Sequence, residues 1–120
     1  MSPAPQTAYP RRAEVYLLDF APATGHEMTG LHPCVVVQND VGNQHSRLTI
    51  VVSITSNLRV ASLPVGVFLT AGTGGVLHDC AAHCGHVDTV DKRRLVRLIG
   101  TLPDPEMLLI DKALVCSLGL

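Results

Sequence analysis

Short apolar runs, each followed by a polar or glycine-containing turn, recur along most of this sequence. They span residues 13–20, 34–38, 48–54 and 63–69. Runs of this length, rich in β-branched residues, predict strands rather than helices. Pro64 has no N–H to donate to a neighbouring strand, so we expect the fourth run to lie at an edge of the sheet.

Two of the connections between these runs are long and polar. Residues 21–33 form a loop that is longer than most strand connections, and such loops often carry function. Residues 39–47 are expected to form a polar turn, in which Gly42 and Asn43 are able to adopt positive φ.

The later part of the chain continues the β pattern less clearly. Residues 76–90 contain small residues that weaken strand propensity, yet the flanking pattern favours an extended segment that bends at Gly85. Asp91 is expected to cap one turn through residues 92–94. Residues 95–102 are predicted to form the closing strand.

One long helix is predicted near the C-terminal end. Asp104 as N-cap and Pro105 at the first helical position indicate its start, and Gly119 indicates its end. An apolar stripe, expected to pack on the sheet, consists of Met107, Ile110, Leu114 and Leu118. Asp111 lies at the edge of this stripe, where we expect it to pair with an arginine.

Many short strands and one C-terminal helix together predict a mainly β fold, built as a small antiparallel barrel. The length of 120 residues suits a single domain. We assign residues 11–120 to that domain and the proline-containing residues 1–10 to a disordered leader.

Composition indicates a soluble protein, with 47% hydrophobic and 16% charged residues. No apolar run approaches the roughly 20 residues that a membrane helix needs, and the N-terminus lacks the features of a secretory signal. We therefore expect a cytoplasmic protein with no membrane contact. Its cysteines, expected to be reduced and mostly buried, are Cys34, Cys80, Cys84 and Cys116.

The charge balance gives no global sign of nucleic-acid binding, because the formal net charge is −1 and the pI is about 6.6. Nucleic-acid affinity usually comes from a basic surface, so any RNA contact must be local. The basic residues do cluster, as Lys92, Arg93, Arg94 and Arg97. This cluster is either a solvated basic turn or a local site for an anion.

Residues 78–86 concentrate six histidine, cysteine and aspartate side chains. A zinc ion needs four such groups at about 2.0–2.3 Å. If this segment is an extended strand, with about 3.3 Å per residue, at most two neighbouring side chains could reach one ion. A bend at Gly85 or a helical conformation would bring more of them together. We predict no metal site and interpret the run as a strand with buried thiols and exposed imidazoles.

Several short motifs occur along the chain in one order and spacing. They are Gly25-His26-Glu27, Pro33, Val37-Gln38-Asn39-Asp40, Gly42-Asn43, Ile54-Thr55 and Thr89-Val90-Asp91-Lys92-Arg93-Arg94-Leu95. With these motifs, the chain resembles the MazF/PemK family of toxin endoribonucleases from type II toxin-antitoxin systems, over roughly residues 11–120. The resemblance implies an SH3-like barrel of the CcdB/PemK type, a homodimer, and an antitoxin protein as partner.

The resemblance also implies sequence-specific cleavage of single-stranded RNA without metal or cofactor, leaving 2′,3′-cyclic phosphate and 5′-hydroxyl ends. Such cleavage needs a base, an acid and donors to the phosphate. The family has a threonine where Thr55 stands, but an arginine where His32 stands. Imidazole lacks the bidentate grip of guanidinium on phosphate, but it transfers protons more readily near neutral pH.

We therefore expect His32 and Thr55 to be catalytic, with Glu27 orienting His32 or acting as its partner. The alternatives are a loop histidine without a role and a strand-end hydroxyl bonded to its own backbone. The resemblance further implies RNA contacts by His26, Asn39, Arg59 and His86.

One departure from the family affects RNA binding. The family usually has Glu-Gln-Ile-Arg where this chain has residues 85–88, Gly-His-Val-Asp, so polar base contacts are replaced and a positive charge becomes negative. Two other functions therefore compete with RNA cleavage. One is a binding module for an antitoxin or, as for CcdB-type toxins, a topoisomerase; the other is a metal-responsive protein built on residues 78–86.

Overall fold

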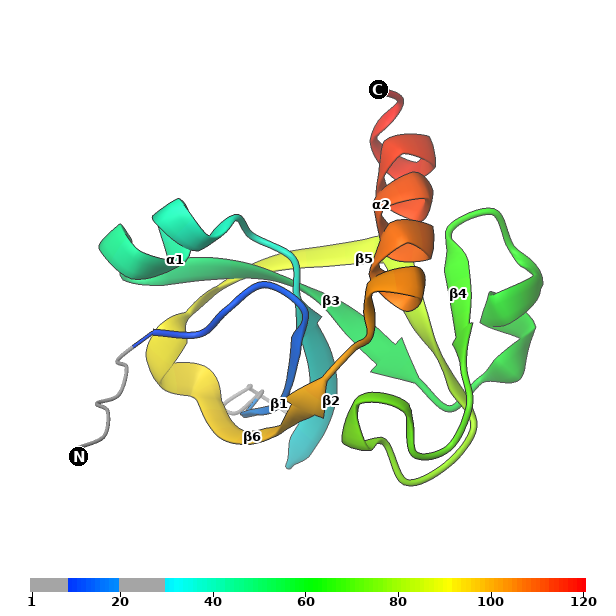
Figure 1. Cartoon of the computed structure of the whole chain (residues 1–120), viewed down its shortest axis with the longest axis horizontal. Helices are drawn as coiled ribbons and strands as arrows, with labels where there is room; N and C mark the ends of the chain where they lie inside the picture. Colours follow the sequence, from blue (N-terminus) through cyan, green and yellow to red (C-terminus); the bar gives the residue numbers. More distant parts are fainter. Residues whose placement is uncertain (1–8, 20–29) are drawn as a thin grey trace.

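The computed structural model describes residues 9–19 and 30–120. Its six strands form one antiparallel sheet in the order β4-β5-β3-β2-β1-β6 (Figure 1). The strands are β1 (Glu14–Asp19), β2 (Leu31–Val36), β3 (Leu48–Thr55), β4 (Gly66–Leu69), β5 (Cys80–Asp91) and β6 (Leu95–Thr101). Within the described chain the edge strands β4 and β6 do not pair with each other, so the curved sheet stays open. The predicted β class and the edge position of the strand after Pro64 are confirmed.

Within residues 9–19 and 30–120, two α-helices and three 3₁₀ turns connect and cover the strands. They are α1 (Asp40–His45), α2 (Asp104–Leu118), η1 (Leu58–Ser62), η2 (Thr73–Gly75) and η3 (Lys92–Arg94). Asp91 caps η3 as predicted, because its side chain accepts a hydrogen bond from the backbone N–H of Arg93 at 2.9 Å. No helix among the described residues has the length and apolar character needed to cross a bilayer.

The predicted polar turn at residues 39–47 is wrong, because most of it forms α1. The Asn39 side chain caps this helix by accepting a hydrogen bond from the Gly42 N–H at 2.7 Å. Neither Gly42 nor Asn43 has a positive φ. Asn43 is instead fully buried, where it accepts from the Thr49 hydroxyl at 2.6 Å and donates to the Gln38 carbonyl at 2.9 Å. This helix therefore fixes the connection between β2 and β3.

The core lies on both faces of the sheet. On one face, α2 packs against strands; Figure 1 shows it, orange to red, above β5 and beside β4. The buried residues of that face include Val15, Val35, Val52, Met107, Ile110 and Ala113. The curvature of the sheet encloses a second cluster, which consists of Leu18, Cys34, Val36, Val51 and Val90. The two faces are filled by alternate residues of the same strands.

The predicted helix α2 is confirmed, with differences at both ends. It begins at Asp104, so the cap position falls on Pro103, which offers no side-chain hydrogen bond. Gly119 ends it in a left-handed conformation, with φ of 71°. Leu118, predicted to pack on the sheet, is 58% exposed, because the end of the helix extends past the sheet.

The segment before β1 is tied to three other parts of the fold by Arg12. Its backbone N–H donates to Asp40 Oδ1 at 2.7 Å, and its Nε donates to the Val37 carbonyl at 2.9 Å. Its guanidinium also pairs with Asp111 of α2, which confirms the predicted arginine partner. Residues 1–8 of the predicted leader lie outside the described residues, and Pro10 is buried.

The predicted bend at Gly85 is present in β5. Val87 pairs with Val52, but the next pair on β3 joins Ser53 with His83, so residues 84–86 bulge out of the ladder. A bulge of this kind bends the strand and redirects its side chains. The irregularity lies directly beside the end of β3.

Candidate functional site

His32 and Thr55 lie at the same end of neighbouring strands. His32 was predicted in a loop, but it belongs to β2 and pairs with Leu18 of β1. Thr55 is the last residue of β3. The last pair in the ladder between β2 and β3 is Cys34 with Ser53, and His32 and Thr55 each lie two residues beyond it. Since side chains alternate along a strand, both are directed to the face on which Cys34 and Ser53 lie.

The hydroxyl of Thr55 is held by the turn that follows β3. Its oxygen accepts a hydrogen bond from the Asn57 N–H at 3.1 Å. This is the contact expected of a strand-end hydroxyl that bonds to its own backbone. This contact uses a lone pair and leaves the hydroxyl hydrogen to donate elsewhere, for example to a phosphate oxygen. The observed bond is therefore compatible with a second, functional contact.

Arg59 is the cation nearest along the chain to Thr55. Asn57 caps η1 by accepting from the Arg59 N–H at 3.1 Å, which holds Arg59 just after the strand end. The residue is exposed, and no carboxylate within residues 9–19 and 30–120 pairs with its guanidinium. An arginine in this state can bind phosphate without first breaking an ion pair.

His86 lies across β3 from β2, beside the same strand end. Its Nδ1 is 3.4 Å from the Ser53 hydroxyl oxygen, and its Nε2 is 3.5 Å from Asp88 Oδ2. The His83 ring meets it edge-on, with the ring centroids 6.1 Å apart. Sequence reasoning identified His86 but missed Ser53 and Asp88. The available signals were a polar residue inside an apolar run and a carboxylate two positions after a histidine.

The other predicted site residues do not join this group. Asn39 lies beyond the opposite end of β2, where its side chain caps α1. Glu27 and His26 lie outside the described residues. The structure therefore places His32, Thr55 and His86 toward the same end of three adjacent strands, with Arg59 close by in sequence.

The basic cluster at η3 is largely engaged in holding the fold. The side chain and backbone of Arg93 donate to Asp91, and these bonds, with the charge of Arg47, lower the pKa of Asp91 to about 2. Lys92 Nζ donates to the Asn43 carbonyl, and Arg94 Nε donates to the Asp19 carbonyl at 3.0 Å. These contacts favour the structural interpretation of the cluster.

The run from 78 to 86 divides between a turn and a strand. Cys80 and Cys84 are buried, and burial raises the pKa of the Cys84 thiol to about 11, so this sulfur stays protonated at neutral pH. In the part of the chain that the structure describes, no three histidine, cysteine or acidic side chains are placed to hold a metal ion. All four cysteines are free thiols, and Cys116 is exposed rather than buried.

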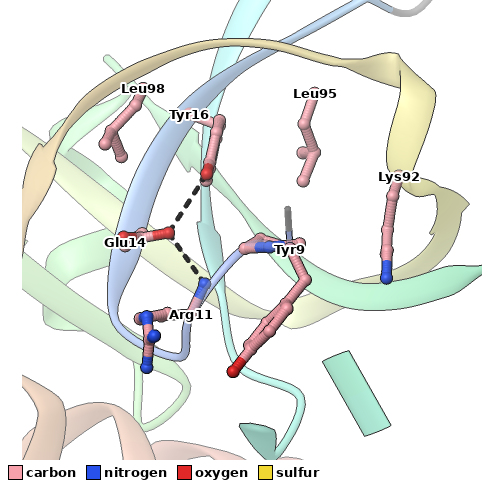
Figure 2. A pocket seen from close by; sticks show the side chains of 8 residues that line it. Tyr9, Arg11, Glu14, Tyr16, Lys92, Leu95 and Leu98 are labelled. Carbon is pink, nitrogen blue, oxygen red and sulfur yellow. Dashed lines mark hydrogen bonds between the residues drawn. The ribbon is translucent and has the colours of Figure 1, made fainter. Parts of the chain in front are cut away.

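An open cavity of about 310 Å³ lies beside the start of β1 (Figure 2). It is lined by Tyr9, Pro10, Arg11, Glu14, Tyr16, Lys92, Leu95 and Leu98. Figure 2 shows Glu14 accepting hydrogen bonds from the Arg11 N–H at 2.7 Å and the Tyr16 hydroxyl at 3.1 Å. Burial, helped by the Glu14 charge, raises the pKa of Tyr16 to about 12, so its hydroxyl acts as a donor and not as a base. No predicted site residue lines this cavity, and we do not assign catalysis to it.

Known proteins resemble this chain in sequence and in structure. Endoribonuclease EndoA of Bacillus subtilis (strain 168) is 38% identical over 110 residues, covering 92% of this chain and 95% of that protein. An endoribonuclease in complex with its cognate antitoxin, from Mycobacterial species, superposes with a TM-score of 0.78 at 24% identity, covering 92% of this chain and 96% of the other. A MazE-MazF structure from Deinococcus radiodurans gives a TM-score of 0.79 at 24% identity, covering 95% and 99%.

The structural matches support the fold, and the sequence matches support the family. A family model described as "PemK-like, MazF-like toxin of type II toxin-antitoxin system" matches residues 11–118, which is nearly the whole domain. Together with the relative from Bacillus subtilis, this match shows that the chain belongs to the PemK-like, MazF-like family of toxins.

Proposed function

We propose that this protein is an endoribonuclease that cleaves single-stranded RNA at specific sequences and is neutralised by a cognate antitoxin. The reaction leaves 2′,3′-cyclic phosphate and 5′-hydroxyl ends and needs no metal ion. The kinship with an endoribonuclease supports the reaction class. The observation that carries the proposal is the position of His32 and Thr55 at the same end of adjacent strands.

Each side chain at this end supplies one function that RNA cleavage needs. The Thr55 hydroxyl donates to a phosphate oxygen while its own oxygen stays bonded to Asn57. Arg59 supplies a guanidinium for the phosphate, which partly replaces the arginine that relatives carry at the position of His32. His32 transfers a proton. The predicted roles of Glu27 as a partner of His32 and of His26 in RNA contact remain predictions.

The active form is a homodimer that uses α2. Several large apolar side chains of this helix are about half exposed or more: Leu108, Leu109, Val115 and Leu118. A second copy of the chain would remove this surface from water. Light scattering at micromolar concentration should give twice the 12.8 kDa of one chain. A monomer mass under these conditions would refute the dimer.

Cleavage is tested by incubating the protein with a long single-stranded RNA in excess EDTA and mapping the new ends. We expect cuts at a short common sequence, with cyclic phosphate and 5′-hydroxyl termini. Thr55→Ala should cleave roughly 10²- to 10³-fold more slowly, because one donor to the transition state is lost. Thr70→Ala, which changes an exposed threonine in a turn, is the matched control and should cleave at the parent rate.

Variants of His32 separate cleavage from the competing binding function. A rate that depends on proton transfer by an imidazole should vary with pH, whereas an arginine keeps its charge. His32→Ala should lose most activity, and His32→Arg should keep phosphate binding. If the parent cleaves no RNA and only His32→Arg does, the protein acts as a binding module. A parent rate that is flat with pH would remove His32 from the mechanism.

A further inference from the structure

Three polar side chains form a chain of contacts beside the end of β3. The Ser53 hydroxyl oxygen lies 3.4 Å from His86 Nδ1, and His86 Nε2 lies 3.5 Å from Asp88 Oδ2. The side chains of His86 and Asp88 are 59% and 43% exposed, so solvent and ligands reach them. A hydroxyl, an imidazole and a carboxylate in this order are the parts of a proton-transfer group.

The bulge in β5 creates this arrangement. Val87 pairs with Val52, so in an uninterrupted ladder His86 would pair with Ser53. Ser53 pairs with His83 instead. His86 is thus displaced from the ladder, and its ring turns across β3 to reach the Ser53 hydroxyl. Asp88, two positions further, remains paired with Val51 and lies on the face to which His86 points.

The carboxylate favours one position for the proton of the imidazole ring. An ionised Asp88 only accepts hydrogen bonds, so it favours the tautomer with the hydrogen on Nε2. In that tautomer the lone pair of Nδ1 lies toward the Ser53 hydroxyl, which is able to donate to it. A hydroxyl is therefore already located at the nitrogen that is able to accept a proton.

We propose that His86 is the general base of RNA cleavage and that Asp88 is its positioning residue. This inference rests on the proposed function. The 2′-hydroxyl of the substrate takes the place of the Ser53 hydroxyl at Nδ1 and gives its proton to that nitrogen. The 2′ oxygen forms a bond to phosphorus, and the bond from phosphorus to the 5′ oxygen breaks. Protonated His32 gives its proton to the departing 5′ oxygen, so both protons are accounted for.

The spacing of the side chains suits one nucleotide. Ser53 and Thr55 lie on the same face of β3, two residues or about 7 Å apart. In this proposal, a ribose over Ser53 has its 2′-hydroxyl at His86, and the phosphate that follows it is bound by the Thr55 hydroxyl. His32, two residues beyond the last pair of β2 with β3, is at the same end of the sheet as Thr55, and the proposal assigns it to the leaving oxygen.

The decisive variant is His86→Gln. Glutamine donates and accepts hydrogen bonds, and the family usually has it at this position, but it cannot take up a proton. If His86 is the base, this variant should cleave about 10²- to 10⁴-fold more slowly than the parent with RNA affinity nearly unchanged. His45→Gln, which changes an exposed histidine of α1, is the matched control and should cleave at the parent rate.

A substrate with sulfur in place of the 5′ oxygen distinguishes base from acid. Thiolate leaves without a proton, so this substrate should restore cleavage to His32→Gln. It should not restore cleavage to His86→Gln, because the 2′-hydroxyl still has to lose its proton. Restoration of His86→Gln by this substrate would overturn the assignment of His86 as the base.

Asp88 is tested with Asp88→Ala. We expect a lower kcat with KM within about twofold of the parent, since the residue acts on His86 and not on substrate. Nitrogen-15 NMR of the protein without RNA should show the His86 hydrogen on Nε2 in the parent. In Asp88→Ala it should show a mixture of the two neutral tautomers, with the hydrogen on Nε2 in some molecules and on Nδ1 in others. A His86 hydrogen on Nδ1 in the parent overturns the role of Asp88.

The outcomes separate this inference from the proposed function. A parent that cleaves RNA, together with a His86→Gln variant of equal rate, overturns the inference and keeps the proposed function. A parent that cleaves no RNA under any condition overturns both, whatever the NMR experiment shows.

Discussion

Ala13 is the one residue other than glycine with a positive φ in the described chain, at 85°. Its N–H donates to the Val36 carbonyl and its carbonyl accepts from the Leu102 N–H, both at 2.9 Å. These two bonds hold the backbone in a conformation that costs an L-residue with a Cβ roughly 1–2 kcal/mol. The fold therefore carries local strain at the point where the chain enters β1.

Ala13→Gly should stabilise the protein, although glycine usually destabilises. Relief of strain contributes about 1–2 kcal/mol, and the greater flexibility of glycine in the unfolded chain removes about 0.5–1 kcal/mol. Loss of a half-buried methyl group removes a few tenths more. The net gain is about 0.5 kcal/mol, or roughly 2–3 °C in Tm for a domain of this size.

The measurement is urea and thermal unfolding of the parent and three variants. Ala71→Gly is the matched control, because Ala71 is exposed and lacks a positive φ, and it should be neutral or destabilised. Ala13→Val should lose more than about 1 kcal/mol, since a branched side chain increases the strain. If Ala13→Gly loses as much stability as Ala71→Gly, the argument from strain is refuted.

Three further predictions concern the scaffold. Asn43→Leu should destabilise by about 2–4 kcal/mol in urea unfolding, because the buried Thr49 hydroxyl and the Gln38 carbonyl lose their partners; a Thr49→Val background that leaves this cost unchanged would contradict the reasoning. Gly66→Ala should prevent stable folding, seen as lost chemical-shift dispersion, since an added Cβ would lie 1.8 Å from the Val60 carbonyl oxygen. Asp91→Asn should be less stable than the parent above about pH 4, and the difference should disappear as pH falls toward about 2, where the parent carboxylate is protonated; a difference that persists at the lowest pH would show that the charge is not its cause.

The strands could be predicted from the sequence because each depends on a local signal. Pro64 marked an edge, Gly85 marked a bend, and Asp91 marked a capped turn, and each of these features acts within a few residues. The helix α1 could not be predicted in this way, because six residues are too few to show a period. Gly42 and Asn43 also carry the composition of a turn, and only the burial of Asn43 against Thr49 overrides it.

In the candidate site, too, local signals predict some features, whereas contacts between distant residues determine the others. His32 and Thr55 could be proposed as site residues from motifs, but their position at the same end of adjacent strands depends on the register between β2 and β3, which no local pattern determines. The contact of Ser53 with His86 requires the bulge as well as that register. The positive φ of Ala13 depends on hydrogen bonds to Val36 and Leu102, which are distant in sequence.

The position of β1 in the sheet determines when the fold can be completed during synthesis. β1 lies between β2 and β6, and the Arg12 that precedes it pairs with Asp111 of α2. During synthesis, one edge of β1 therefore stays unpaired until β6 has been made, and Arg12 has no partner on α2 until that helix follows. Folding that depends on such distant contacts is slow. A chain made only as far as β5 therefore cannot complete the sheet around β1.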